Sequence, residues 1–167
     1  MMNRRFEEDK EYMSYVSDLL KNKEVQQLKE YPHHYYNNRL AHSIAVSYYS
    51  YLVAKKLRAN KASVARAGLL HDMYYYNREE AKEVLNGRSH NATHPQIAIK
   101  NAERITSLTS KEKDIIGSHM WGATKRRPRY KESYIVTMVD KYCAMSDLCL
   151  PIRRKFKRKF HRQPASY

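Results

Sequence analysis

His71 and Asp72 stand side by side directly after the apolar run at 68–70, and they are the most informative pair in the chain. An ionisable pair in such a place is costly to bury unless a hydrogen-bond partner or a metal ion compensates it. Imidazole and carboxylate groups are also common ligands of metal ions. The pair therefore indicates a metal site, provided that other ligands occur elsewhere in the chain.

Four further residues supply such ligands. His42 lies among alanines and an isoleucine in a stretch of helical periodicity, and Asp140 follows the mainly apolar segment 135–139. A carboxylate beside the core needs a partner, and one metal ion can pair with several such groups at once. His94 and His119 complete the set. Any one of these residues alone is more often an ordinary core or surface side chain, so it is the joint pattern that favours a site.

Helices must position these residues, because the composition and the apolar periodicity favour helices throughout. Ala, Leu, Lys, Glu and Arg are plentiful, whereas the chain has only four Gly and five Pro in 167 residues. No strand alternation is sustained over a useful length, so the predicted fold class is all-α. Helices are expected over about 4–20, 22–30, 39–58, 61–73, 78–86, 93–105, 110–119 and 131–149.

Three helix boundaries have specific sequence patterns. Thr109 with Glu112 three residues later is typical of a capping box. The dipeptide at 86–87, Asn-Gly, is typical of a left-handed helix stop. The run Thr-His-Pro at 93–95 is expected to open a helix, because proline favours the first helical turn.

The length suits one domain with its own core. We expect N-terminal helices packed on the domain over 1–37, the domain core over 38–150 and a basic, flexible tail over 151–167. The chain has no run of 18 apolar residues and no apolar segment typical of a signal peptide, so a cytoplasmic protein is predicted. Cys143 and Cys149 are too few for a disulfide framework.

The net charge of +15 is unevenly distributed, with +7 in the segment 151–167 and +4 in the segment 125–132. Basic segments attract polyanions such as nucleotides, nucleic acid or acidic lipid. For the tail, a solvated segment that keeps the protein in solution is the favoured interpretation. For 125–132, which follows His119 closely, a functional role at the mouth of the site is about as well supported.

The order of the six candidate ligands resembles that of the HD superfamily of metal-dependent phosphohydrolases. The segment 39–43 resembles the family's Arg-x-x-His-Ser helix, 68–72 resembles its Gly/Ala-x-Leu-His-Asp segment, and 139–141 resembles its closing Asp-Lys. The resemblance covers about 38–148. It extends to the subgroup that binds two metals, which includes small bacterial HD proteins and the HD-type diadenosine tetraphosphate hydrolases.

The resemblance implies a site for two divalent ions. It assigns the first ion to His42, His71, Asp72 and Asp140. It assigns the second ion to His94 and His119, with Asp72 bridging the two. Such a mixture of imidazoles and carboxylates suits iron, manganese or zinc, and also cobalt or nickel, whereas calcium or magnesium sites are richer in oxygen. His90 is expected to be a loop histidine, with an alternative ligand or an outer partner as the other interpretations.

The implied activity is hydrolysis of a phosphate ester or anhydride of a nucleotide or small phosphorylated metabolite. Two such ions lower the pKa of a bound water and neutralise phosphate charge, and Asp72 is the expected catalytic residue that orients the water. Cations near the metals are expected to contact the substrate, namely Arg39, Lys141, Arg126 and Arg127.

Two other functions stay open at this point. Some relatives with the same ligand order are di-iron oxygenases, and air-sensitive iron with oxygen consumption would indicate that activity. The basic segments also permit a non-catalytic module that binds a nucleotide or RNA, although nucleic acid is not the favoured partner. The substrate, the metal and the oligomeric state are not specified by the sequence.

Overall fold

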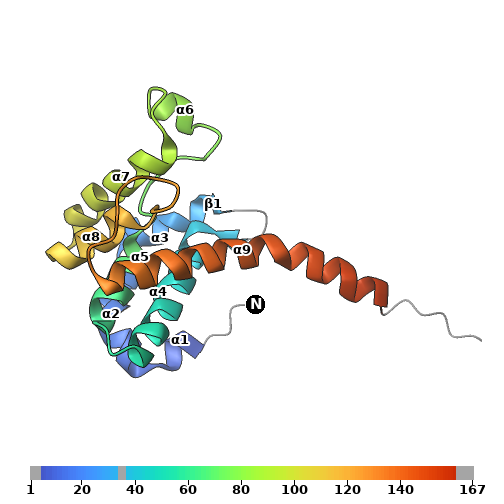
Figure 1. Cartoon of the computed structure of the whole chain (residues 1–167), viewed down its shortest axis with the longest axis horizontal. Coiled ribbons are helices and arrows are strands. Elements are labelled where there is room, and N and C mark those ends of the chain that lie inside the picture. The colour runs from blue at the N-terminus through green and yellow to red at the C-terminus, as the bar shows by residue number, and fades with distance from the viewer. Residues whose placement is uncertain (1–4, 34–36, 161–167) are drawn as a thin grey trace, which may run out of the picture.

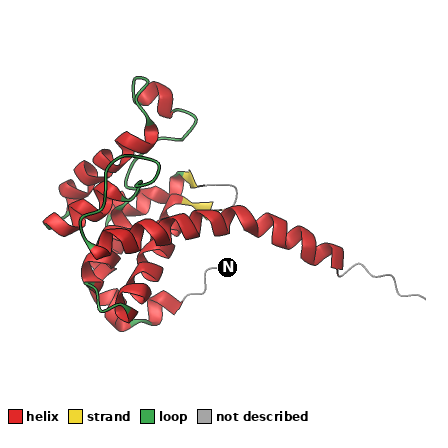
Figure 2. Ribbon diagram, in the orientation of Figure 1, coloured by secondary structure: helices red, strands yellow, loops and turns green. Residues whose placement is uncertain are grey.

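The computed structural model describes residues 5–33 and 37–160, with the backbone alone for 5, 33, 37 and 146–160. Over these residues the chain forms a bundle of α-helices with one pair of two-residue strands (Figures 1 and 2). The predicted all-α class is therefore confirmed. The elements are α1 (Arg5–Glu8), α2 (Lys10–Lys21), α3 (Lys23–Gln27), a 3₁₀ turn (Leu28–Glu30), β1 (Pro32–His33), β2 (Asn37–Asn38), α4 (Arg39–Lys56), α5 (Lys61–Leu70), α6 (Ala81–Val84), α7 (His90–Ile105), α8 (Ser110–Ser118) and α9 (Lys131–Phe160).

α4 and α5 pack against each other at the centre of the bundle (Figure 1). α9 contacts both of these helices, and α8 contacts α5. α2 closes another side of α5, and the hydroxyl groups of Tyr12 and Ser47 lie 2.8 Å apart where it meets α4. The inner faces of these helices bury apolar side chains, including Val46, Leu69, Leu70, Ile115 and Val136. This burial supplies the main favourable term in folding.

Gly68 allows α4 and α5 to approach closely. A methyl group added at Gly68 would lie 2.9 Å from the Cα atom of Ser47, a distance shorter than real Cβ contacts. We expect Gly68→Ala to lower the free energy of unfolding by about 1–3 kcal/mol, because the two helices must separate to accept the methyl group. Urea denaturation measures this change. Alanine has the higher helix propensity, so unchanged or increased stability would contradict the close approach.

The helix boundaries agree with the sequence patterns at two of the three positions. Thr109 and Glu112 form the predicted capping box at the start of α8. Asn86 and Gly87 both have positive φ angles, of 50° and 76°, after α6. The expectation of a helix that opens at 93–95 is wrong, because α7 begins at His90 after an extended Ser89, and Pro95 lies inside it.

α9 continues to Phe160, beyond the expected end near residue 149 (Figure 1). The backbone of 151–160 is therefore helical, whereas its side chains, those of 146–150 with Cys149, and residues 161–167 lie outside the described part of the chain. The assignment of 151–167 as a flexible tail and the domain limits stay predictions. Within 5–33 and 37–160, no helix is both long and apolar enough to cross a membrane.

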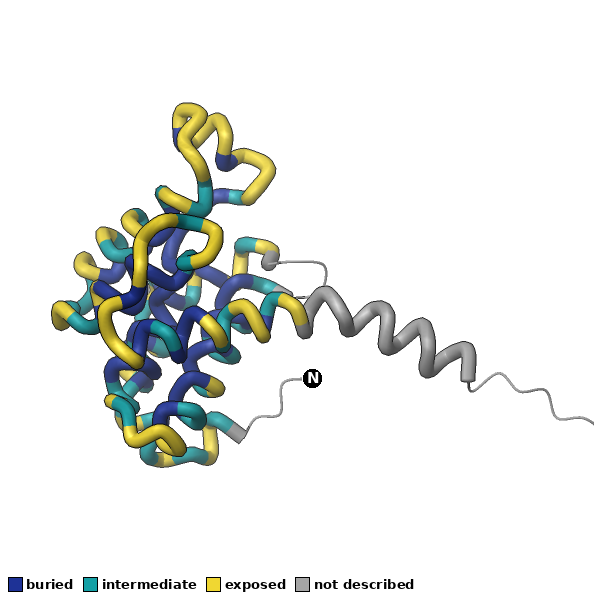
Figure 3. Tube along the Cα trace, viewed as in Figure 1, coloured by how far each residue is buried: buried dark blue, intermediate teal, exposed yellow. Residues whose placement is uncertain are grey.

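The segment 74–89, with α6 at its tip, projects from the bundle (Figure 1) and is largely exposed (Figure 3). It nevertheless buries a small apolar cluster of its own. This cluster consists of Tyr74, Tyr76, Ala81 and Leu85, against which Ile97 of α7 packs. The projecting segment is therefore anchored to α7 through this cluster, directly after the His71-Asp72 pair.

Candidate metal centre

The six predicted ligands lie in one cluster, although they come from five different parts of the bundle. The pair at 71–72 follows the last residue of α5, and His119 follows the last residue of α8. The remaining three residues lie within helices, His42 in α4, His94 in α7 and Asp140 in α9. Five of the six are buried, and Asp140 is partly buried. The bundle thus brings imidazoles and carboxylates together in a place that water reaches poorly.

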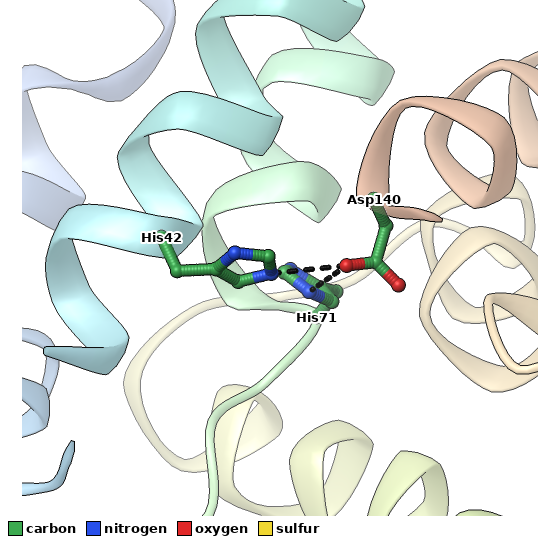
Figure 4. Close-up of side chains that lie close together, drawn as sticks. All are labelled: His42, His71 and Asp140. Carbon is green, nitrogen blue, oxygen red and sulfur yellow. Dashed lines mark hydrogen bonds and ion pairs between the residues drawn. The ribbon is translucent and has the colours of Figure 1, made fainter. Parts of the chain in front are cut away.

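His42, His71 and Asp140 form one half of the cluster (Figure 4). Oδ1 of Asp140 lies 2.9 Å from Nε2 of His42 and 3.6 Å from Nε2 of His71. One ligand atom from each of the three residues lies within 4.8 Å of the others. Metal–ligand bonds of about 2.0–2.2 Å place neighbouring ligand atoms roughly 3 Å apart. The spacing therefore fits one ion held by three residues.

His94, His119 and Asp72 form the other half. Nε2 of His94 lies 2.8 Å from Nε2 of His119. Oδ1 of Asp72 lies 3.3 Å from Nε2 of His94 and 3.6 Å from that of His119, whereas its Oδ2 lies 3.7 Å from Nε2 of His71. The two oxygens of Asp72 therefore face different halves of the cluster, which is the arrangement that a bridging carboxylate requires.

Backbone carbonyls determine which imidazole nitrogens are available as ligands. Nδ1 of His71, His94 and His119 lies 2.8, 2.9 and 2.7 Å from a carbonyl oxygen of the preceding turn. Because a carbonyl oxygen only accepts, each Nδ1 carries the hydrogen, and each neutral ring presents a lone pair at Nε2. The lone pairs of His94 and His119 then face each other, which is unfavourable unless a cation or a proton lies between them. The donor set therefore fits a metal ion.

Nε2 of His71 gives the same indication. It is buried and has no hydrogen-bond partner within the described residues. Burial disfavours the charged ring, but the carboxylates of Asp72 and Asp140 outweigh it and raise the pKa of His71 to about 9. Burial acts against the charged form of Asp72 as well, yet the neighbouring imidazoles, His71 first, hold its pKa well below the usual range. The surroundings thus attract positive charge strongly, as a cation site must.

His119 is suited to be a neutral ligand. Burial is the main cause that lowers its pKa to about 3, and the nearby rings of His94 and His71 act in the same direction. A metal ligand must be an unprotonated imidazole, and His119 has that form at neutral pH before any ion binds.

Arg39, predicted to contact the substrate, lies buried beside the site instead of in an open position. Its guanidinium donates hydrogen bonds of 2.6 and 3.1 Å to the backbone carbonyls of Tyr74 and Tyr76. It also lies over the ring of Tyr74, 3.6 Å from its centroid. These contacts occupy the cation with the segment that follows Asp72, so the geometry favours a positioning role, and substrate contact stays a prediction.

The other three predicted cations lie on or near the loop after α8. Nζ of Lys141 donates a hydrogen bond of 2.6 Å to the carbonyl of Trp121. The guanidinium of Arg126 lies over Gly117, where an added methyl group would be 2.5 Å from its Cζ. Arg127 is exposed. Their contact with a substrate stays a prediction.

His90 is a residue whose place the sequence analysis missed. The expectation of a loop histidine is wrong, because His90 is the first residue of α7. Its ring stacks on that of His94 with centroids 4.4 Å apart and 17° between the planes. The spacing of four residues indicates this contact when both residues lie on one helix, because residues i and i+4 share one helix face. The proline at 95, however, predicts a helix that begins after His90.

The family model described as "HD domain" matches residues 39–145, more than half of the chain. The matched range begins at Arg39 and includes all six residues of the cluster. No curated protein and no solved structure matches the chain.

Proposed function

The chain belongs to the HD domain family, which has a metal-dependent phosphohydrolase-type fold, and from this we propose that it is a metal-dependent phosphohydrolase. The proposed substrate is a phosphate ester or anhydride of a nucleotide or another small phosphorylated metabolite. The observation that carries the proposal is the convergence of imidazole lone pairs on Asp72 and Asp140. Such a convergence of acceptors is unfavourable unless a cation or a proton lies between them, and metal ions would satisfy the whole set of groups at once.

The residues divide between two proposed ions. His42, His71 and Asp140 would hold one ion and His94 and His119 the other, while Asp72 has one oxygen on the side of each half. Divalent ions bound there would lower the pKa of a water molecule and neutralise charge on a phosphate. The imidazole content favours iron, manganese or zinc over calcium or magnesium.

The chain's own residues would then orient the reaction. The carboxylate of Asp72, fixed between His71 and His94, would accept a hydrogen bond from the attacking water. Lys141, Arg126 and Arg127 are the cations proposed to neutralise the rest of the substrate, because they lie on or next to the loop that follows His119.

Removal of metal ions is expected to abolish phosphoester hydrolysis. The purified protein should contain two divalent ions per chain. Chelation should remove the activity, and one of iron, manganese or zinc should restore it. Metal analysis, followed by a screen of phosphoesters and nucleotides with the identified metal, measures both quantities.

Three outcomes of that screen would count against the proposal. Absence of bound metal after reconstitution with iron, manganese and zinc would contradict the site itself. Oxygen consumption without hydrolysis of any phosphoester would favour an oxygenase. Polynucleotide binding with a steep salt dependence, unchanged in His71→Ala and without hydrolysis, would favour a binding module.

A further inference from the structure

We propose that His90 is a positioning residue for the second half of the metal centre. With Tyr76, it holds the ring of His94 in the orientation in which Nε2 of His94 faces Asp72 and His119. This inference rests on the proposed function as far as the metal is concerned. Neither His90 nor Tyr76 is among the six candidate ligands.

The first step is the contact between His90 and His94. The two residues lie one turn apart on the same face of α7, and their rings are stacked nearly parallel at 4.4 Å. The backbone carbonyl of His90 also accepts the hydrogen bond from Nδ1 of His94, at 2.9 Å. His90 therefore restricts His94 twice, through its ring and through its carbonyl oxygen.

The second step is that His90 is itself held in place. The hydroxyl of Tyr76 lies 3.1 Å from Nδ1 of His90. The ring of Tyr74 meets that of His90 edge to face, with centroids 5.2 Å apart, and also contacts the ring of His94 at 5.3 Å. Both tyrosines are buried although the segment around them is exposed. The rings of Tyr74, Tyr76 and His90 thus form an aromatic cluster that packs against the ring of His94.

The third step is the connection of this aromatic cluster to the main bundle. Arg39 of α4 holds the backbone carbonyls of Tyr74 and Tyr76 through its guanidinium. A continuous series of contacts therefore runs from α4 through the segment after Asp72 to the first turn of α7. Outer partners of this kind orient metal ligands, and their loss typically reduces metal affinity by about 10- to 100-fold.

Direct coordination by His90 is the main alternative, and the geometry disfavours it. Two histidines that bind the same ion turn their nitrogens toward a common point, with the nitrogens roughly 3 Å apart. The rings of His90 and His94 are instead stacked face to face, with 17° between their planes, and Nδ1 of His90 lies 3.1 Å from the hydroxyl of Tyr76.

Three substitutions test the inference. His90→Ala removes the ring, His90→Phe keeps a stacking ring without nitrogens, and Tyr76→Phe removes only the hydroxyl that holds His90. Tyr75→Phe is the matched control, since its hydroxyl donates to the carbonyl of Glu24 away from the cluster. Each variant is made in the wild-type chain and in His42→Ala, where the ion that remains is the one at His94 and His119.

The readout is the dissociation constant for manganese or cobalt, with the cobalt absorption spectrum as a report on ligand geometry. Thermal unfolding checks that each variant folds. We expect His90→Ala to weaken the second ion by about 10- to 100-fold and to leave the first unchanged. His90→Phe and Tyr76→Phe should weaken it only a few-fold, with a shifted cobalt spectrum, and Tyr75→Phe should match the wild type.

Other outcomes would overturn the inference in distinguishable ways. If His90→Phe loses the second ion as completely as His90→Ala, His90 is a ligand. If folded His90→Ala binds the second ion with wild-type affinity, His90 has no positioning role. If the wild type binds two ions but hydrolyses no phosphoester, the proposed function fails while this inference stands. If the wild type binds no divalent ion, both fail.

Discussion

Asp72→Asn is expected to fold normally, to bind both ions more weakly and to hydrolyse phosphoesters at least about a hundredfold more slowly than the wild type. The physical reason is the position of the carboxylate, whose two oxygens face the two halves of the cluster. Asparagine keeps the shape of the side chain but removes the negative charge that attracts cations. Metal analysis and kcat/KM with the identified metal measure the change.

Two further variants sharpen the result for Asp72. Within the described residues, the close contacts of Asp140 in the cluster are with His42 and His71, so Asp140→Asn should weaken one ion and retain the other. Asp18→Asn is the matched control, because Asp18 is largely exposed and pairs with Arg66. An Asp72→Asn protein with two ions and wild-type kcat/KM would show that Asp72 does not bridge the ions.

Arg39→Met is expected to lower the free energy of unfolding by about 3 kcal/mol. The substitution leaves the buried carbonyls of Tyr74 and Tyr76 without their donors, at a cost of about 1–3 kcal/mol each. It also removes a cation that lies over the ring of Tyr74, which contributes roughly 1–2 kcal/mol when desolvated. The relief from burying a charge offsets part of this loss. Urea denaturation measures the difference.

Comparison with other arginine variants separates this structural role from a charge effect. Arg39→Lys keeps the charge but cannot donate to both carbonyls in a fixed fork, so its stability should lie between those of the wild type and Arg39→Met. Arg104→Met is the control, because Arg104 is exposed and its pairing with Glu24 is weak at 3.4 Å. If Arg39→Met were as stable as this control and only KM rose, Arg39 would be a substrate contact.

The order of the candidate ligands and the helical class both follow from the sequence. Helical periodicity predicted most elements, and the capping box at Thr109 was located correctly, because both depend on residues within one or two turns. The motif at 68–72 indicates a candidate metal site for the same reason. A glycine, two leucines and an ionisable pair are adjacent in the chain, so this pattern can be recognised without knowledge of the fold.

The local pattern gave a wrong prediction at the start of α7. Proline at position 95 favours a first helical turn, so the start of α7 was expected near it. The structure places the start at His90, with an extended Ser89 before it. Because α7 begins earlier than the proline predicts, His90 lies on the helix, where its ring stacks on that of His94. The role of His90 was therefore hidden by an error in a boundary.

The sequence by itself thus determined which groups are available for metal binding, and in what order. Only the tertiary structure decided how they meet, because contacts such as those of Asp140 with His42 join residues far apart in the chain. The same is true of Arg39, which the sequence places near His42 but which α4 directs to the carbonyls after Asp72. Side-chain direction and the tautomer of each imidazole depend on helix packing, and no local spacing specifies them.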